Sequence, residues 1–138
     1  RRLVKHLARA AARGVDVRVL VSRKSDVFYY ALMQTSYDPY LTKHGVKIFH
    51  YLPTITHAKN YFIDDWVTIG STNLNHRSFL HDLEVDVRIQ HPDNRRILSE
   101  NFEEMCLDAQ EVTLKSLACR PWYERWAARL ILIFRYWN

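Results

Sequence analysis

The stretch HAKNYFIDDWVTIGSTN, residues 57–73, combines the pattern of a β-hairpin with a concentration of polar side chains. Two apolar runs flank the pair Asp64-Asp65, which predicts two antiparallel strands joined by a two-residue turn. In that register Lys59 lies opposite Gly70. The polar end of the return strand therefore comes back beside the start of the first strand.

The polar residues of this hairpin predict a phosphate-handling site. His57 and Lys59 share one face of the first strand, because alternate residues of a strand point the same way. A bulge or a three-residue turn would rotate Ser71 and Asn73 to that face. Lys59, Ser71 and Asn73 can then bind a phosphate, with His57 placed against phosphorus. A histidine acts as a nucleophile when a carboxylate holds one tautomer, and Glu84 is the candidate carboxylate.

Asp64 is expected to serve the turn. It has the opposite parity to His57 and lies about 20 Å along the strand from it, at roughly 3.3 Å per residue. From this geometry we expect turn hydrogen bonds or local charge balance rather than contact with the imidazole.

The pattern before the hairpin predicts an α/β fold. Residues 1–13 have helical periodicity that ends at Gly14, and residues 15–22 alternate as a strand. A helix is predicted from residue 24 to 43, broken near Pro39, followed by a strand over 46–51. A helix between two strands is a βαβ unit.

After the hairpin, the pattern predicts a strand over 83–90, a helix over 93–108 and a last helix over 121–136. The last helix carries Trp122 and Trp126 among arginines. Such a helix suits a membrane interface, or packing on a neighbouring domain; both readings stay open. Elsewhere, His50 and Arg120 are predicted to be ordinary surface residues.

Composition limits the class of protein without selecting one. The chain has 138 residues, which suits a single domain over 1–138, and a net charge of +5 with a pI of about 9.4. This charge favours anionic partners such as phospholipid surfaces or nucleic acid. Cys106 and Cys119 form no metal-binding spacing, and a reducing compartment fits. No apolar run is long enough for a transmembrane helix.

The hairpin residues carry a family resemblance. The HKD motif is His-x-Lys, four residues, then Asp, and here it reads HAKNYFID from His57 to Asp64. The family follows it with Gly-Ser or Gly-Thr, an asparagine and, further on, an acidic residue; GSTN at 70–73 and Glu84 match. RGVDVRVLV, GVKIF and GSTNLNHRSF are similar to bacterial cardiolipin synthases, although His81-Asp82 stands where those proteins commonly have Leu-Asn. The chain thus resembles the phospholipase D superfamily, closest to the C-terminal half of bacterial cardiolipin synthases.

The resemblance implies a three-layer α/β/α sandwich with a mixed sheet, in which two similar halves share one site. The implied reaction needs no metal and no cofactor. One histidine forms a phosphohistidine, and the histidine of the other half protonates the leaving alcohol. The implied catalytic residues are His57, Lys59, Asp64 and Glu84, and the implied phosphate-binding residues are Lys59, Ser71 and Asn73. Whether His57 is the nucleophile or the acid stays open.

The implied substrate is a phospholipid, and the implied partner is a second HKD half, in the same chain or as a symmetry mate. The implied location is the cytoplasmic side of the bacterial inner membrane. Because the sequence starts inside a predicted helix, we expect the C-terminal half of a two-motif enzyme. The alternatives are a homodimeric nuclease of the same superfamily, acting on nucleic acid, and an isolated half-domain without activity of its own.

Overall fold

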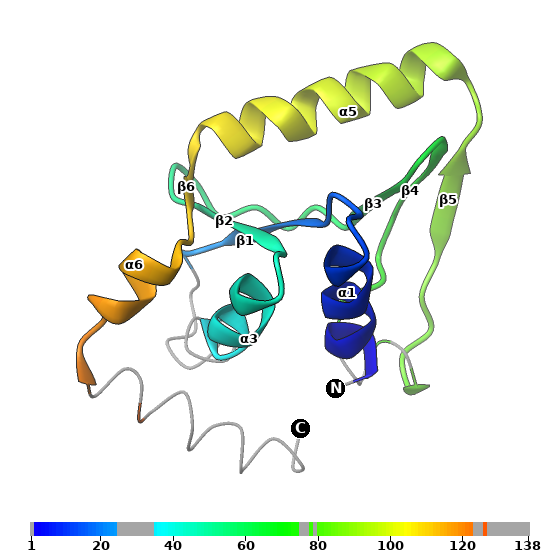
Figure 1. Ribbon diagram of the computed structural model, residues 1–138. Coiled ribbons are helices and arrows are strands. Elements are labelled where there is room, and N and C mark those ends of the chain that lie inside the picture. The colour runs from blue at the N-terminus through cyan, green and yellow to red at the C-terminus, as the bar shows by residue number, and fades with distance from the viewer. Residues whose placement is uncertain (1, 25–34, 75–77, 79, 123–125, 127–138) are drawn as a thin grey trace. The chain divides into compact units, whose positions relative to one another are not determined.

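The computed structural model describes residues 2–24, 35–74, 78, 80–122 and 126 (Figure 1). The chain divides into two compact units, the first comprising Arg1–Thr56 with Cys106–Trp137 and the second His57–Met105. No helix in the described part of the chain is long and apolar enough to cross a membrane.

The first unit is built on a three-stranded sheet in the order β1-β2-β6. Strands β1 (Arg18–Ser22) and β2 (Lys47–Tyr51) are parallel, as the βαβ prediction requires. Strand β6 (Ala109–Glu111) pairs antiparallel with β2. The prediction of a mixed sheet is therefore confirmed in this unit, although the sequence pattern did not predict β6, which is only three residues long.

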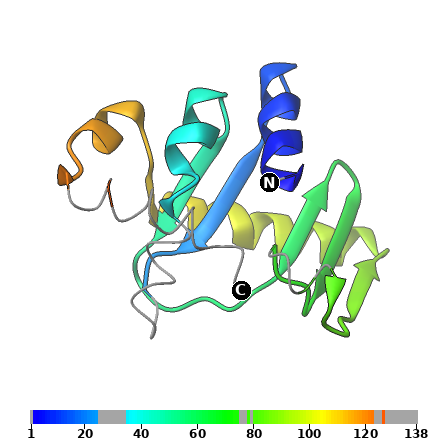
Figure 2. The same cartoon turned by 90° about the horizontal axis from the view of Figure 1, so that it is seen from below.

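Helices α1 (Arg2–Ala12), α3 (Asp38–Lys43) and α6 (Leu114–Ala118) lie on one face of this sheet (Figure 2). The predicted break near Pro39 is confirmed: Thr35 is helical, residues 36 and 37 form a turn, and α3 then begins at Asp38 with Pro39 in its first turn. The missing N–H of proline is harmless there, since no helical hydrogen bond would use it. The start of the predicted helix from residue 24 lies largely outside the described residues, as does the predicted helix over 121–136.

The core of the first unit lies between these helices and the sheet. Its buried apolar side chains are Ala8, Leu41, Val46, Ile48, Val112 and Leu117. The apolar side of α1 faces this core, where Val4, Leu7 and Ala11 pack against the buried cluster. Helix α6, which the sequence pattern missed, begins with a capping box in which the side chains of Thr113 and Ser116 each accept a hydrogen bond from the other's backbone N–H.

A buried polar group accompanies this core and corrects two predictions. His50 is 5% exposed, and its Nε2 lies 3.1 Å from Asp38 Oδ2. Arg120 Nη2 donates a 2.7 Å hydrogen bond to the same oxygen. His50 and Arg120 are therefore not ordinary surface residues. A buried carboxylate needs a paired charge, and Arg120 supplies it.

An exposed carboxylate supports the start of β1. Asp16 lies 2.7 Å from Arg18 Nη2 and 2.9 Å from Lys47 Nζ. Hydrogen bonds from Arg18, and then from Lys47, lower the pKa of Asp16 from 3.8 to about 2. The pair of cations thus ties the segment before β1 to the start of β2.

The second unit contains the antiparallel sheet β3-β4-β5, formed by β3 (Asn60–Ile63), β4 (Trp66–Gly70) and β5 (Asp86–Ile89). Ile63 pairs with Trp66, which confirms the two-residue turn. Asp64, the first turn residue, has a φ of +52°, a left-handed conformation that aspartate tolerates better than most residues.

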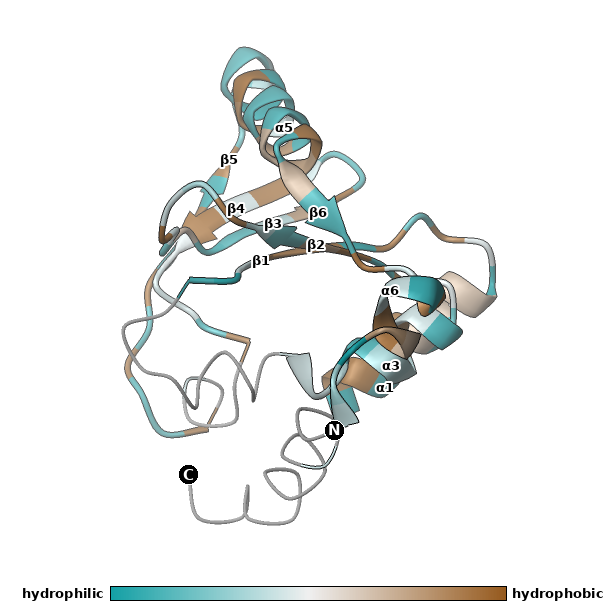
Figure 3. Ribbon diagram, turned by 90° about the vertical axis from the view of Figure 1, so that its left-hand side faces the viewer, coloured by the Kyte–Doolittle hydropathy of each residue, from teal (hydrophilic) through white to brown (hydrophobic). Residues whose placement is uncertain are grey.

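Helix α5 (Pro92–Leu107) follows β5, and hydrophilic and hydrophobic residues alternate along it (Figure 3). Within the second unit its Phe102 ring lies 5.3 Å from the ring of Phe62 on β3. Arg95 donates a hydrogen bond of 2.5 Å to the carbonyl of Asp65 in the turn. The face of β3 that carries Phe62 therefore packs against α5. Tyr61 lies on the opposite face of β3, which is the face that carries the polar residues.

Candidate functional site

His57 and Lys59 contact each other immediately before β3. Lys59 Nζ lies 2.8 Å from His57 Nδ1 and donates a 2.7 Å hydrogen bond to the His57 carbonyl. His57 is exposed and Lys59 half-buried. The predicted imidazole–ammonium pair is thus present in the structure, and the second ring nitrogen, Nε2, lies on the far side of the imidazole from Lys59.

The return strand reaches this pair in the predicted register. The Gly70 N–H donates a 3.0 Å hydrogen bond to the Lys59 carbonyl. A Cβ at Gly70 would lie 2.5 Å from the Val85 carbonyl oxygen and 2.6 Å from Asp86 Cα. Only glycine allows β5 to approach so closely, which brings the residues before and within β5 beside the GSTN segment.

Ser71 is hydrogen-bonded to the segment that leads into β5. Its Oγ donates to Glu84 Oε2 at 2.5 Å and accepts from the Val85 N–H at 3.0 Å. The Ser71 N–H in turn donates to the Val85 carbonyl at 3.0 Å. The single hydroxyl proton of Ser71 is therefore directed to Glu84 in this structure. Contact of the Ser71 hydroxyl with a phosphate remains a prediction, and to donate to phosphate the hydroxyl would have to release Glu84.

Thr72 is held by groups that the sequence analysis did not single out. Its N–H and Oγ1 donate to the two carboxylate oxygens of Asp86, at 3.3 and 2.6 Å. The Tyr61 hydroxyl donates to the Thr72 carbonyl at 2.5 Å. Strand alternation could have indicated Tyr61, because it shares a face with Lys59. It could also have indicated Asp86, which pairs with Gly70. We call Tyr61, Thr72 and Asp86 the Thr72 clamp.

The electrostatics of this region shift two pKa values. Desolvation lowers the pKa of Lys59 below 10.5, while the negative charge of Glu84 acts in the opposite direction. Desolvation raises the pKa of Tyr61 above 10.0, and the charges of Asp86 and Glu84 add to this effect. Tyr61 therefore stays a neutral hydrogen-bond donor, and Lys59 lies close enough to Glu84 to interact with its charge.

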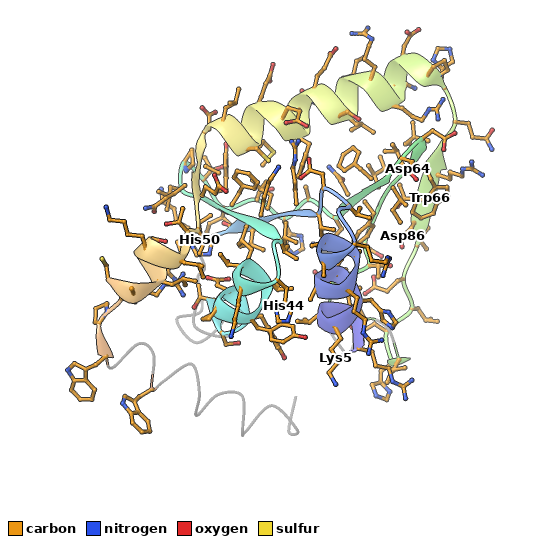
Figure 4. All side chains as sticks on the ribbon, in the orientation of Figure 1. Lys5, His44, His50, Asp64, Trp66 and Asp86 are labelled. Atoms are coloured by element: carbon orange, nitrogen blue, oxygen red, sulfur yellow. The ribbon has the colours of Figure 1, made fainter. Side chains whose placement is uncertain are left out.

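Asn73, Asp64 and Glu84 complete the set of predicted residues. Asn73 is half-buried and follows directly after the Thr72 clamp. Asp64 is exposed in the turn at the tip of the hairpin, at the opposite end of β3 from Lys59 (Figure 4). The carboxylate of Glu84 accepts a hydrogen bond from Ser71. That Glu84 also orients the imidazole of His57 remains a prediction. Within the described ranges, no three His, Cys, Asp or Glu side chains group closely enough to hold a metal ion.

Comparison with known proteins identifies the family. Residues 1–106 match the family model described as "Cardiolipin synthase, PLD-like domain". The probable cardiolipin synthase YwiE of Bacillus subtilis is 33% identical over 108 residues, 78% of this chain and 22% of that protein. Cardiolipin synthase B of Escherichia coli K12 is 31% identical over 124 residues, 88% of this chain and 30% of that protein. The chain belongs to the phospholipase D-like domain family of cardiolipin synthases.

A solved structure supports the fold. The phospholipase D family member Nuc from Salmonella typhimurium matches with a TM-score of 0.62 and 20% identity, covering 80% of this chain and 72% of that chain. The phospholipase D-like α/β fold is thus confirmed. The matches to the two cardiolipin synthases, in contrast, span less than a third of their length.

Proposed function

We propose that this chain supplies one HKD half of an enzyme that transfers phosphatidyl groups between phospholipid alcohols, as a cardiolipin synthase does. The observation that carries this proposal is the contact between His57 and Lys59 at the end of the hairpin where the GSTN segment returns. The family match over residues 1–106 supports the same assignment. The enzyme is then a phospholipase D-superfamily phosphatidyltransferase.

In the proposed reaction, a nitrogen of the catalytic histidine attacks phosphorus and the bond from phosphorus to the leaving alcohol oxygen breaks. The histidine of the other half gives its proton to that oxygen. An acceptor hydroxyl then attacks the phosphohistidine, loses its proton to the same group and releases the first histidine. Lys59 and Asn73 would stabilise the charge that develops on the phosphoryl oxygens.

The contacts of His57 suggest how its role is set. When Lys59 donates to Nδ1, the neutral imidazole carries its proton on Nε2, so this nitrogen has no lone pair with which to attack phosphorus. When Lys59 instead binds a phosphate, Nδ1 is free to donate to a carboxylate such as Glu84, and Nε2 becomes a nucleophile. The nucleophile would thus be the neutral imidazole whose Nδ1–H donates to a carboxylate, whereas the acid would be the imidazolium, which carries a proton on both ring nitrogens.

The second half and the membrane complete the proposal. We infer that the partner is another HKD half, because the reaction needs a proton donor that a single histidine does not supply while it is bound to phosphorus. The limited length of the match within the curated relatives is consistent with this. A phospholipid substrate requires contact with a membrane surface, so we propose peripheral association.

The proposal is tested by replacing His57 in protein that pairs this chain with a second HKD half. We expect His57→Ala to reduce lipid transfer by at least roughly 10³-fold, by analogy with the loss of other catalytic nucleophiles and bases. The readout is conversion of radiolabelled phosphatidylglycerol, with circular dichroism as the check on folding. His91, an exposed histidine of the same unit, provides the matched control as His91→Ala.

The same preparations distinguish the alternatives. Near-normal transfer by His57→Ala would exclude the catalytic assignment. Nicking of plasmid DNA that depends on His57, without lipid products, would favour the nuclease. Failure to transfer lipid or to nick DNA even when a second half is present would agree with the inactive half-domain.

A further inference from the structure

The outer side of α1 carries a row of positive charge that the proposed catalytic site does not use. Arg2, Lys5, Arg9 and Arg13 recur every three or four residues from the start of the helix to the turn after it, and all four are exposed. At 3.6 residues per turn this spacing places them along one side of the helix. We call these four residues the α1 basic row.

The α1 basic row is not neutralised within the described part of the chain. Helix α1 contains no acidic residue. The ion pairs that the structure describes involve other cations, namely Arg18, Lys47, His50, His91, Arg95, Arg96 and Arg120. Lys5 projects from α1 into solvent (Figure 4), and Lys43 and His44 at the end of the neighbouring α3 are exposed as well.

Helix stability accounts for only part of this arrangement, because Arg9 lies in the last turn of α1, where the helix dipole favours a cation. The partial positive charge at a helix N-terminus disfavours cations, and Arg2 and Lys5 lie in the first turns of α1. Packing does not require them either, because Val4, Leu7, Ala8 and Ala11 on the other side of the helix supply its contacts with the core. Arg2 and Lys5 therefore add charge at a small cost to the helix.

We propose that the α1 basic row docks the protein on an anionic phospholipid surface. Clustered lysines and arginines bind such surfaces through the negative potential of their headgroups, and the row presents guanidinium and ammonium groups without an intervening carboxylate. The choice of a bilayer over nucleic acid rests on the proposed function, which brings the protein to phospholipid. The docking itself is independent of catalysis and lies in the first unit, outside the HKD residues.

The test measures binding of the chain to vesicles by co-sedimentation. The vesicles contain phosphatidylcholine alone or equal parts of phosphatidylcholine and phosphatidylglycerol. We expect binding only to the anionic vesicles and weaker binding at high salt, where charges are screened. The variant Lys5→Gln, Arg9→Gln, Arg13→Gln should partition roughly 100-fold more weakly, because each cation contributes about fivefold near an anionic surface. Its circular dichroism should not change, since all three side chains are exposed.

The matched control removes the same net charge elsewhere. Arg88, Arg96 and Lys115 are exposed and lie outside α1, and their replacement by glutamine should leave vesicle binding within about threefold of the parent, the part of the effect that net charge alone produces.

An equal loss in both variants, or no loss in the α1 variant, would overturn the inference. So would an α1 variant that loses binding to duplex DNA while keeping its binding to vesicles. Vesicle binding that depends on α1 in protein without lipid-transfer activity would leave the inference standing and count against the proposed function alone.

Discussion

Gly70→Ala is the substitution whose effect the structure defines most sharply. The new Cβ would lie 2.5 Å from the Val85 carbonyl oxygen and 2.6 Å from Asp86 Cα, and also 1.9 Å from Asp86 Oδ1. The carboxylate oxygen can rotate away, but the two backbone atoms cannot. Because ordinary contacts begin near 3.5 Å, β4 and the segment leading into β5 must separate by about 1 Å.

A separation of that size breaks specific hydrogen bonds. The Ser71 N–H to Val85 O bond is 3.0 Å long and the Thr72 N–H to Asp86 bond 3.3 Å. Two lost hydrogen bonds cost about 1 kcal/mol each, and the overpacking adds about 1–3 kcal/mol. The reduced entropy of the unfolded chain returns less than about 1 kcal/mol. We expect the free energy of unfolding of the second unit to fall by roughly 2–4 kcal/mol.

The assay combines urea denaturation with hydrogen exchange of the peptide that contains the Ser71 and Thr72 amides. Gly70→Ala should lower the denaturation midpoint and speed the exchange of those amides. Gly14→Ala is the control: its Cβ meets nothing within 4 Å, but its φ of +93° makes alanine strained by about 1–2 kcal/mol. That variant should leave exchange at 71 and 72 unchanged. An unchanged midpoint and full protection in Gly70→Ala would refute the reasoning.

Three other substitutions have defined outcomes. Asp16→Asn should remove about 0.5 kcal/mol or less at pH 7, since the pair is exposed, and should flatten the loss of stability that the parent shows as pH falls from 3.8 to about 2. Asp38→Ala leaves the half-buried Arg120 without a carboxylate, with only its 3.5 Å contact to the Thr35 carbonyl, and should cost about 3 kcal/mol in thermal denaturation. Tyr61→Phe removes the donor to the Thr72 carbonyl and should lower kcat for lipid transfer roughly tenfold, with KM little changed.

Each of these has a contrary result. An acid titration of Asp16→Asn that matches the parent would show that the carboxylate does not gain stability from its cations. A stable Asp38→Ala protein would mean that Arg120 finds water or another acceptor at little cost. A Tyr61→Phe enzyme with normal kcat would show that the Thr72 clamp is dispensable for positioning the GSTN segment.

The hairpin could be predicted because its information is local. The alternation of apolar residues and the pair Asp64-Asp65 together define the register, and Gly70 lies opposite Lys59 as predicted. The left-handed conformation of Asp64 in the turn could also be predicted, since aspartate tolerates a positive φ. The approach of β5 to Gly70 was not, because it depends on a strand more than ten residues away in the sequence.

The polar contacts were harder to predict than the strands. The spacing of His57 and Lys59 predicted that they share a face, and in the structure their side chains contact each other. The hydroxyl of Ser71 donates to Glu84, a choice that only three-dimensional packing decides. The burial of His50 was missed for a similar reason. A histidine in an alternating strand looks the same whether it meets solvent or a carboxylate carried by a helix between the two strands.

The pairing of Arg120 with the buried Asp38 has a consequence for where the chain can be cut. Arg120 directly precedes Pro121, so the ion pair with Asp38 lies at the start of the C-terminal segment. A protease site engineered after Pro121 would release that segment and leave the first unit's ion pair whole. Removing two more residues would also remove Arg120 and leave the buried carboxylate of Asp38 without a cation. The first unit would then stay folded only if Asp38 took up a proton or water reached it.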